Sequence, residues 1–235
     1  MTVHEWGTAP DFVGPRHELR ESFLLDLVVT ARPGPQVLNV GAGQGSFSRL
    51  LAARGFAVTS AEASHTAVDA LRDRVAGEAV EANAASLPFA DATFDAVILG
   101  EVLEHLEDDV SALREARRVL RSGGVIAASV PRNPAWFSSS DRWAGHVRRY
   151  TREALLGAFR DADLAVEHCI AWGFPVSALY HRTVYERHLA RRGAAPPTAR
   201  QRPALAVLHA LLQLDRLFLG HERGALGYLV LARHS

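Results

Sequence analysis

Lysine is absent from this chain of 235 residues, and all 26 of its basic residues are arginine. They are balanced by 26 acidic residues, so the formal net charge is zero. A neutral chain lacks the basic excess with which proteins bind nucleic acid or an anionic membrane surface. We therefore predict no nucleic-acid partner. We interpret the missing lysine as codon bias in a GC-rich genome and not as a functional signal.

Cysteine occurs once, as Cys169, which excludes an internal disulfide and fits a reducing compartment. The N-terminus lacks the basic-then-apolar pattern of a secretion signal. The leucine-dense stretch 204–219 is too short, and too often interrupted by polar residues, to span a membrane. We therefore expect a cytoplasmic protein without stable membrane insertion, either a monomer or a homodimer. Its hydrophobic content of 48% is that of a globular protein with a substantial core.

A glycine-rich stretch organises the rest of the chain. Residues 37–40 read as a buried strand, Gly41-Ala42-Gly43-Gln44-Gly45 as a tight turn, and the residues that follow as a helix. A second apolar run then ends at Glu62. This order predicts half of a doubly wound nucleotide-binding sheet. Glycines let a ligand approach the backbone closely, and the first helical turn offers free N–H groups. The carboxylate of Glu62 could accept both hydroxyls of a ribose.

The spacing of this turn is Gly-x-Gly-x-Gly, because Ser46 occupies the position where a dinucleotide-binding fingerprint needs its third glycine. Further motifs follow in order: Leu87-Pro88-Phe89, Phe94-Asp95, Glu104-His105 and Arg118-Val119-Leu120-Arg121-Ser122-Gly123-Gly124. Together these motifs cover about residues 37–130 and resemble the class I S-adenosylmethionine-dependent methyltransferases. The resemblance implies S-adenosylmethionine as the cofactor and S-adenosylhomocysteine as the product, and we expect no metal.

The resemblance also implies roles for single residues. It places Glu62 at the cofactor's ribose and Asn83 where the family commonly has an acid that holds the adenine amino group. The side-chain carbonyl of asparagine still accepts such a hydrogen bond. Asn39 stands where the family usually has aspartate, and Ser122 replaces a proline. The predicted cofactor-binding residues are Asn39, Gly41, Ala42, Gly43, Gly45, Glu62, Ala63, Asn83, Ala84 and Gly100.

The remaining patterns predict the further strands and helices of an α/β fold. The resemblance implies a doubly wound seven-stranded sheet that is mostly parallel and has an antiparallel last strand. Apolar residues recur every three or four positions in residues 16–30, which indicates an amphipathic helix. The resemblance implies that this helix folds over the cofactor as a lid, and the alternative is a helix packed on the sheet edge. We expect one domain, with an N-terminal helical lid (1–35), a cofactor-binding core (36–130), an acceptor loop (131–150) and a helical insert before the last strand (174–220).

The acceptor loop is the most individual segment. It holds two tryptophans, four arginines and a histidine among proline and serine breaks, a composition typical of a functional loop. In relatives of the family, a His-x-x-Arg-Tyr-Thr stretch borders the acceptor site, and here it reads from His146 to Thr151. Its arginines could clamp a carboxylate, phosphate or phosphonate, or the segment could be a solvated loop tied down by ion pairs. The substrate-binding candidates are Trp6, Arg142, Trp143, Arg148, Arg149 and Tyr150.

These features predict methyl transfer to a small molecule, and we favour O-methylation of a specialised metabolite, with an anionic acceptor as one form of it. A neutral hydroxyl must lose its proton, and the catalytic candidates for the base are His105 and His146; an anionic oxygen needs no base. His105 could equally have a structural role. N- or C-methylation of an amine or quinone-like acceptor is the alternative activity. A non-catalytic cofactor-binding module and a nicotinamide dehydrogenase are hypotheses from other classes.

Overall fold

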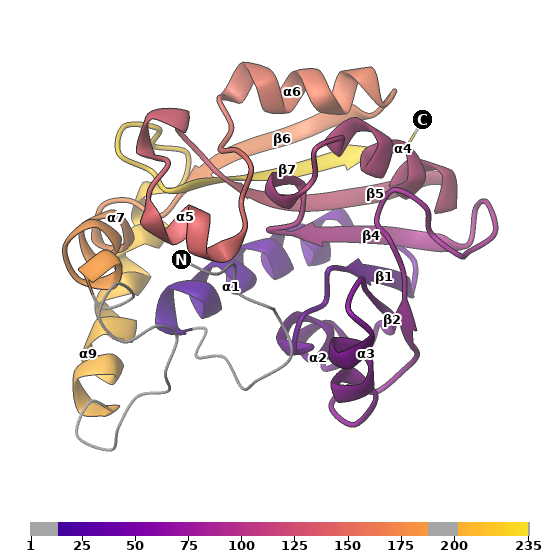
Figure 1. Ribbon diagram of the computed structural model, residues 1–235, viewed down its shortest axis with the longest axis horizontal. Helices are drawn as coiled ribbons and strands as arrows, with labels where there is room; N and C mark the ends of the chain where they lie inside the picture. Colours follow the sequence, from indigo (N-terminus) through magenta and orange to yellow (C-terminus); the bar gives the residue numbers. More distant parts are fainter. Residues whose placement is uncertain (1–13, 188–201, 235) are drawn as a thin grey trace.

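The computed structural model describes residues 14–187 and 202–234 (Figure 1). Within these ranges seven strands form one sheet in the order β3-β2-β1-β4-β5-β7-β6. Strand β7 is antiparallel to both of its neighbours, and the other pairs are parallel. The predicted doubly wound sheet with an antiparallel last strand is confirmed. The strands are β1 (Gln36–Val40), β2 (Ala57–Glu62), β3 (Ala79–Glu81), β4 (Phe94–Gly100), β5 (Leu120–Pro131), β6 (Ala165–Trp172) and β7 (Gly227–Arg233).

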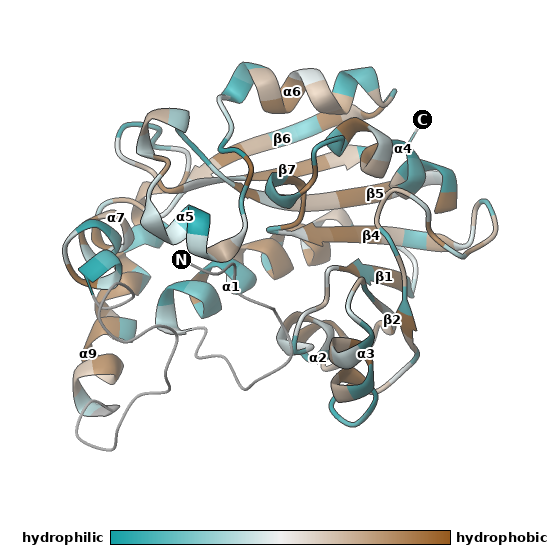
Figure 2. Ribbon diagram, in the orientation of Figure 1, coloured by the Kyte–Doolittle hydropathy of each residue, from teal (hydrophilic) through white to brown (hydrophobic). Residues whose placement is uncertain are grey.

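Helices cover both faces of the sheet. Successive residues of a strand point to opposite faces, and apolar side chains lie on both faces here. In β4, Ala96 and Ile98 pack with α1 (Gly14–Ala31) and α2 (Ser46–Ala52), whereas Val97 and Leu99 pack with α4 (Asp109–Val119) and α6 (Arg152–Asp161). Helix α3 (His65–Arg72) packs beside β3. The central strands β4 and β5 are apolar for most of their length (Figure 2), as expected for strands covered on two faces.

The winding of the sheet reverses at β1, which lies between β2 and β4. In open α/β sheets, ligands bind at the carboxyl ends of the strands beside such a switch point. The glycine-rich turn follows β1, Glu62 ends β2, and Glu101 directly follows β4. These three features therefore meet at one edge of the sheet.

The predicted acceptor loop has more regular structure than the sequence indicated. It contains a short 3₁₀ helix, η2 (Pro134–Trp136), and the helix α5 (Ser139–Ala144). Ser138 and Asp141 form a capping box at the start of α5, which satisfies free backbone N–H groups there. The segment therefore contains a capped helix that carries Arg142, and Arg148 and Arg149 follow after its end.

The helical insert before β7 begins with α7 (Val176–Tyr180), which continues as the π-helical turn η3 (His181–Tyr185). It resumes with α9 (Arg202–Leu212) and the 3₁₀ helix η5 (Gln213–Phe218). The Gly/Pro break predicted at 193–197 and the candidate Trp6 lie outside the described residues. In the described ranges, no helix combines the length and apolar character needed to cross a bilayer.

Candidate active site

A cavity of about 890 Å³ opens at the switch-point edge of the sheet, between α1, α5, η3 and the carboxyl ends of β1, β2 and β4. It brings together most of the site residues predicted from the sequence. Gly45, Arg142, Arg148 and Tyr150 do not line it. The predicted residues that do line it are Asn39, Gly41, Ala42, Gly43, Glu62, Ala63, Asn83, Ala84, Gly100, His105, Trp143, His146 and Arg149.

The three glycines of the turn have positive φ angles of 65°, 52° and 78°, a region that residues with a side chain rarely adopt. A Cβ atom on Gly41 would lie 2.5 Å from Cγ2 of Val102, and one on Gly45 would lie 2.4 Å from Cγ1 of Val75. A Cβ atom on Gly43 would meet nothing within 4 Å. Gly43 therefore leaves open space beside the backbone for a ligand, whereas Gly45 is required by packing.

Polar side chains border this turn. One carboxylate oxygen of Glu62 accepts the N–H of Gly43 at 2.8 Å, and the other accepts the N–H of Ala63 at 2.8 Å. Each oxygen keeps a further lone pair. The amide of Asn39 donates to Ser48 at 2.9 Å in the protein interior. The side-chain oxygen of Asn83 accepts the N–H of Ala85 at 2.9 Å and can accept one more bond.

Two histidines of the cavity wall, His105 and His146, contact each other. His105 belongs to the 3₁₀ helix η1 (Leu103–His105), and His146 follows α5. Their rings lie edge to face, with centroids 4.7 Å apart. Burial, together with the neighbouring His146, lowers the pKa of His105 to about 4. His105 therefore carries no charge near neutral pH.

An aspartate orients the second histidine. The Nδ1–H of His146 donates to Oδ1 of Asp141 at 2.9 Å, and Arg149 donates to the same oxygen at 2.8 Å. Burial raises the pKa of the Asp141 carboxyl, but the hydrogen bonds from His146 and Arg149 outweigh it and hold that pKa well below its usual range. Because Nδ1 is the donor, Nε2 of His146 is left as the proton acceptor.

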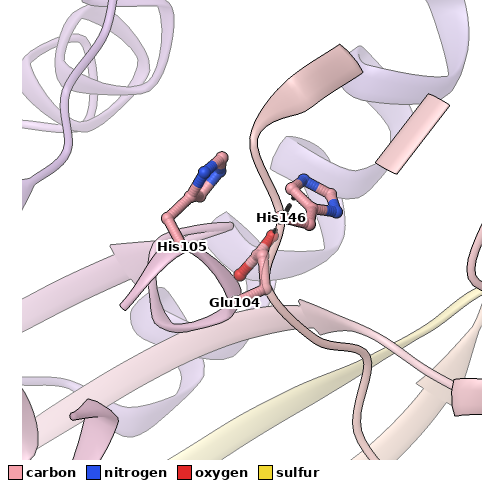
Figure 3. A group of neighbouring side chains, drawn as sticks. All are labelled: Glu104, His105 and His146. Atoms are coloured by element: carbon pink, nitrogen blue, oxygen red, sulfur yellow. Dashed lines mark ion pairs between the residues drawn. The ribbon is translucent and has the colours of Figure 1, made fainter. Parts of the chain in front are cut away.

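A buried acid lies close to the Nε2 atom of this histidine. Glu104 is completely buried, neither of its oxygens has a hydrogen-bond partner, and Oε1 lies 3.8 Å from Nε2 of His146 (Figure 3). Burial and the nearby Glu101 raise the pKa of Glu104 well above its ordinary value. The described part of the chain contains one group of side chains that could hold a metal ion, Glu104, His105 and His146. Their potential ligand atoms all lie within 4.8 Å of one another. That no metal is needed stays a prediction.

The arginines of the predicted clamp point to different partners. Arg142 lies over the ring of Phe137, 6.0 Å from its centre. Arg148 donates to the backbone oxygen of Glu107, outside the cavity. Arg149 reaches the cavity, but Asp141 neutralises it. These three side chains are not assembled into one anion site.

Several charged residues of the cavity were not predicted from the sequence, and three of them lie near one another. Arg16 and Arg20 reach it from α1, and Glu101 reaches it from the end of β4, 3.4 Å from Arg20. Glu101 has a positive φ angle of 59°, a strained conformation that is common at functional sites. The available signals were the four-residue spacing of the arginines on the predicted lid and an acid at the end of the switch-point strand.

Tyr150 lies in the core instead of the cavity. Its hydroxyl donates to Asp109 at 2.6 Å and contacts the backbone oxygen of Leu103 at 3.1 Å. We expect Tyr150→Phe to lower the free energy of unfolding by about 1–3 kcal/mol, because a buried acceptor loses its partner. Urea unfolding measures this change, and the KM for the acceptor should stay the same. A changed KM for the acceptor, together with an unchanged free energy of unfolding, would instead show that Tyr150 contributes to the acceptor site.

Two histidines with lowered pKa values, His105 and His181, should make the folded protein sensitive to acid. Burial also lowers the pKa of His181, helped by Arg16, to about 2. An unfolded histidine titrates near pH 6.5, so below that pH the unfolded chain binds protons that folded His105 and His181 do not bind. The free energy of unfolding should therefore fall by up to about 1.4 kcal/mol per pH unit for each histidine between about pH 6.5 and 4.

Urea unfolding at pH 7, 6 and 5 tests this slope. His181→Gln should make the slope shallower, whereas replacing the exposed His168 of β6 in the same way should leave it unchanged. Equal slopes in all three proteins would show that His181 is not held neutral in the folded state.

Comparison with known proteins adds to this geometry. The family model described as a methyltransferase domain matches residues 38–128. A probable S-adenosylmethionine-dependent methyltransferase from Mycobacterium tuberculosis is 28% identical over 195 residues, which cover 80% of this chain and 71% of the relative. A ubiquinone biosynthesis O-methyltransferase from Pseudomonas paraeruginosa is 30% identical over 193 residues, which cover 72% of this chain and 81% of the relative.

The fold is also similar to that of solved structures. Geranyl diphosphate C-methyltransferase from Streptomyces coelicolor A3(2) superposes with a TM-score of 0.64 at 17% identity. The match covers 93% of this chain and 79% of that protein. At this level of identity the similarity concerns the fold alone.

Proposed function

The chain belongs to the S-adenosylmethionine-dependent methyltransferases, and we propose that it methylates a hydroxyl oxygen of a small organic acceptor. The observation that carries this proposal is the hydrogen bond between Asp141 and His146 in the cavity wall. It provides an oriented base on the side of the cavity away from the glycine-rich turn. The O-methyltransferase relative from Pseudomonas paraeruginosa supports transfer to oxygen.

The residues around the glycine-rich turn fit the cofactor. We propose that Glu62 binds the ribose hydroxyls, that Asn83 and Ala84 border the adenine, and that the cofactor passes the open side of Gly43. Bound S-adenosylmethionine supplies a methyl group already activated by a positively charged sulfur. The protein must therefore align the acceptor and remove its proton, and alignment alone supplies a large part of the rate.

His146 is the proposed base. Its Nε2 takes the hydroxyl proton of the acceptor, and the Asp141 carboxylate stabilises the imidazolium that forms. His105 stays uncharged beside it and offers a hydrogen bond to the acceptor. Trp143 lines the same region and supplies an apolar contact for a ring or chain. We propose that the acceptor is a specialised metabolite, bound between α1, α5 and η3.

A methyl-transfer assay tests this function. The protein is incubated with S-adenosylmethionine labelled in the methyl group and with three panels: catechols, phenols and quinols; aliphatic and aromatic amines; and quinones that accept methyl on carbon. Label in an ether product, located by mass spectrometry, supports the proposal. Label only on nitrogen or carbon would replace it with the alternative activity. Tight cofactor binding without any transfer would favour the non-catalytic module.

Other expectations stay predictions. These are the division of the chain into lid, core, acceptor segment and insert as parts of one domain, the cytoplasmic location and the choice between monomer and homodimer. The assignment to the S-adenosylmethionine-dependent methyltransferases does not depend on these expectations.

A further inference from the structure

One arginine in the cavity is oriented by the fold without being neutralised. Arg16 donates from NH1 to Nδ1 of His181 at 3.0 Å, and its guanidinium lies over the ring of Tyr185, 4.8 Å from the ring centre. Neither partner is an anion. Across residues 14–187 and 202–234, no ion pair joins Arg16 to a carboxylate. A guanidinium fixed in this way keeps its full positive charge for a ligand.

The other charges of this region are paired. Arg20 lies 3.4 Å from Glu101, and Arg149 lies 2.8 Å from Asp141. Arg20 and Arg149 each have a carboxylate within ion-pair distance, whereas Arg16 has none among the described residues.

The acid nearest to His181 is held by other groups. Glu186 lies 3.4 Å from Nε2 of His181, on the opposite side of the ring from Arg16's contact at Nδ1. Its carboxylate accepts hydrogen bonds from the hydroxyl groups of Ser138, Ser139 and Ser140. Glu186 contacts the His181 ring and does not line the cavity. The cavity carboxylate that acts on Arg16 is Glu101, whose ion-pair contact is with Arg20.

We propose that Arg16, positioned by His181 and Tyr185, binds a carboxylate carried by the methyl acceptor. A carboxylate matches the planar fork of a guanidinium better than a spherical anion does. Arg16 and the proposed base His146 both act electrostatically on Glu101, so the two groups face the same part of the cavity. This inference rests on the proposed O-methylation, since it concerns the acceptor of that reaction.

The test measures binding, so that it does not depend on turnover. The protein saturated with S-adenosylhomocysteine is titrated calorimetrically with 3,4-dihydroxybenzoate, 4-hydroxybenzoate and 4-hydroxycinnamate, and with their methyl esters. Wild-type protein should bind at least one acid at least tenfold more tightly than its ester. Arg16→Gln should weaken binding of that acid by about 10- to 100-fold, the range for a charged bidentate pair, and change ester binding less than twofold.

Arg148→Gln is the matched control, because it removes the same charge from an arginine outside the cavity, and it should bind both probes as wild type does. If Arg16→Gln does not fold, Arg16→Lys is measured in its place. This variant keeps the positive charge but loses the planar guanidinium, so it should retain part of the preference for the acid over the ester. Equal losses for acid and ester would show a packing role and overturn the proposal. Weakened S-adenosylhomocysteine binding would assign Arg16 to the cofactor instead, and a wild type that prefers none of the acids would also overturn it.

The two proposals fail separately in this design. Methyl transfer to oxygen without a preference for acids would overturn the carboxylate site alone. Acid-selective binding with label found only on nitrogen or carbon would overturn O-methylation alone.

Discussion

Replacing Glu62 with alanine will raise the Kd for S-adenosylhomocysteine by at least about 100-fold. The proposed contacts are charge-assisted hydrogen bonds from two ribose hydroxyls, each contributing about 1.5–3 kcal/mol. Losing both costs at least about 3 kcal/mol, which corresponds to about 100-fold in affinity. The same carboxylate also accepts the N–H of Gly43, so its loss additionally loosens the turn on which the cofactor would lie.

Isothermal titration with S-adenosylhomocysteine measures this effect. Glu81→Ala is the matched control, because Glu81 ends the neighbouring strand β3 and pairs at the surface with His65. Its affinity should equal that of the wild type. Glu62→Gln keeps one acceptor oxygen and should fall between the two. An affinity of Glu62→Ala within a few-fold of the wild type would rule out the ribose contact.

His146→Ala will lower kcat for a neutral phenol by about 10²- to 10⁴-fold, the usual contribution of a general base. Binding of S-adenosylhomocysteine should not change, because His146 lies apart from the glycine-rich turn. The loss should shrink as the pH rises toward the pKa of the phenol, near 10, since an ionised acceptor needs no base. This recovery separates a catalytic role from a structural one.

Two further variants sharpen the result. His105→Ala changes the neighbouring ring, which has no carboxylate hydrogen bond, and should lower kcat less than tenfold. Asp141→Asn removes the charge that stabilises the imidazolium, but also weakens the cap of α5, so its stability must be measured beside its rate. A His146→Ala enzyme whose rate stays equally low at every pH would remove His146 from the role of base.

The cofactor half of the cavity could be predicted because its signals are local. The spacing of Gly41, Gly43 and Gly45 sets the turn, and the strand order places Glu62 beside it. Backbone conformation at such a turn depends on few neighbours, so a short stretch of sequence specifies it. The roles of these residues toward the cofactor stay proposals, but their positions follow directly from the chain.

The acceptor half could not be predicted in the same way. Of the candidate arginines, Arg142 lies in the short helix α5, whereas Arg148 and Arg149 lie in the irregular segment that follows it. Arg148 and Arg149 are then directed by distant partners, Glu107 and Asp141. Arg16 belongs to a helix whose apolar face was recognisable, but its ligand-facing side is defined only by the contact with His181. Such pairs join residues far apart in sequence, which no local pattern reveals.

The position of β7 has a consequence for how the protein is made. Strands β5 and β6 do not pair with each other; residues 227–233 lie between them and bond to both. During synthesis β6 therefore leaves the ribosome long before its only partner in the sheet. Until β7 arrives, the nascent chain exposes two open strand edges, each of which can pair with another chain. Chaperone demand and aggregation of stalled chains should therefore be greatest in the interval between β6 and β7.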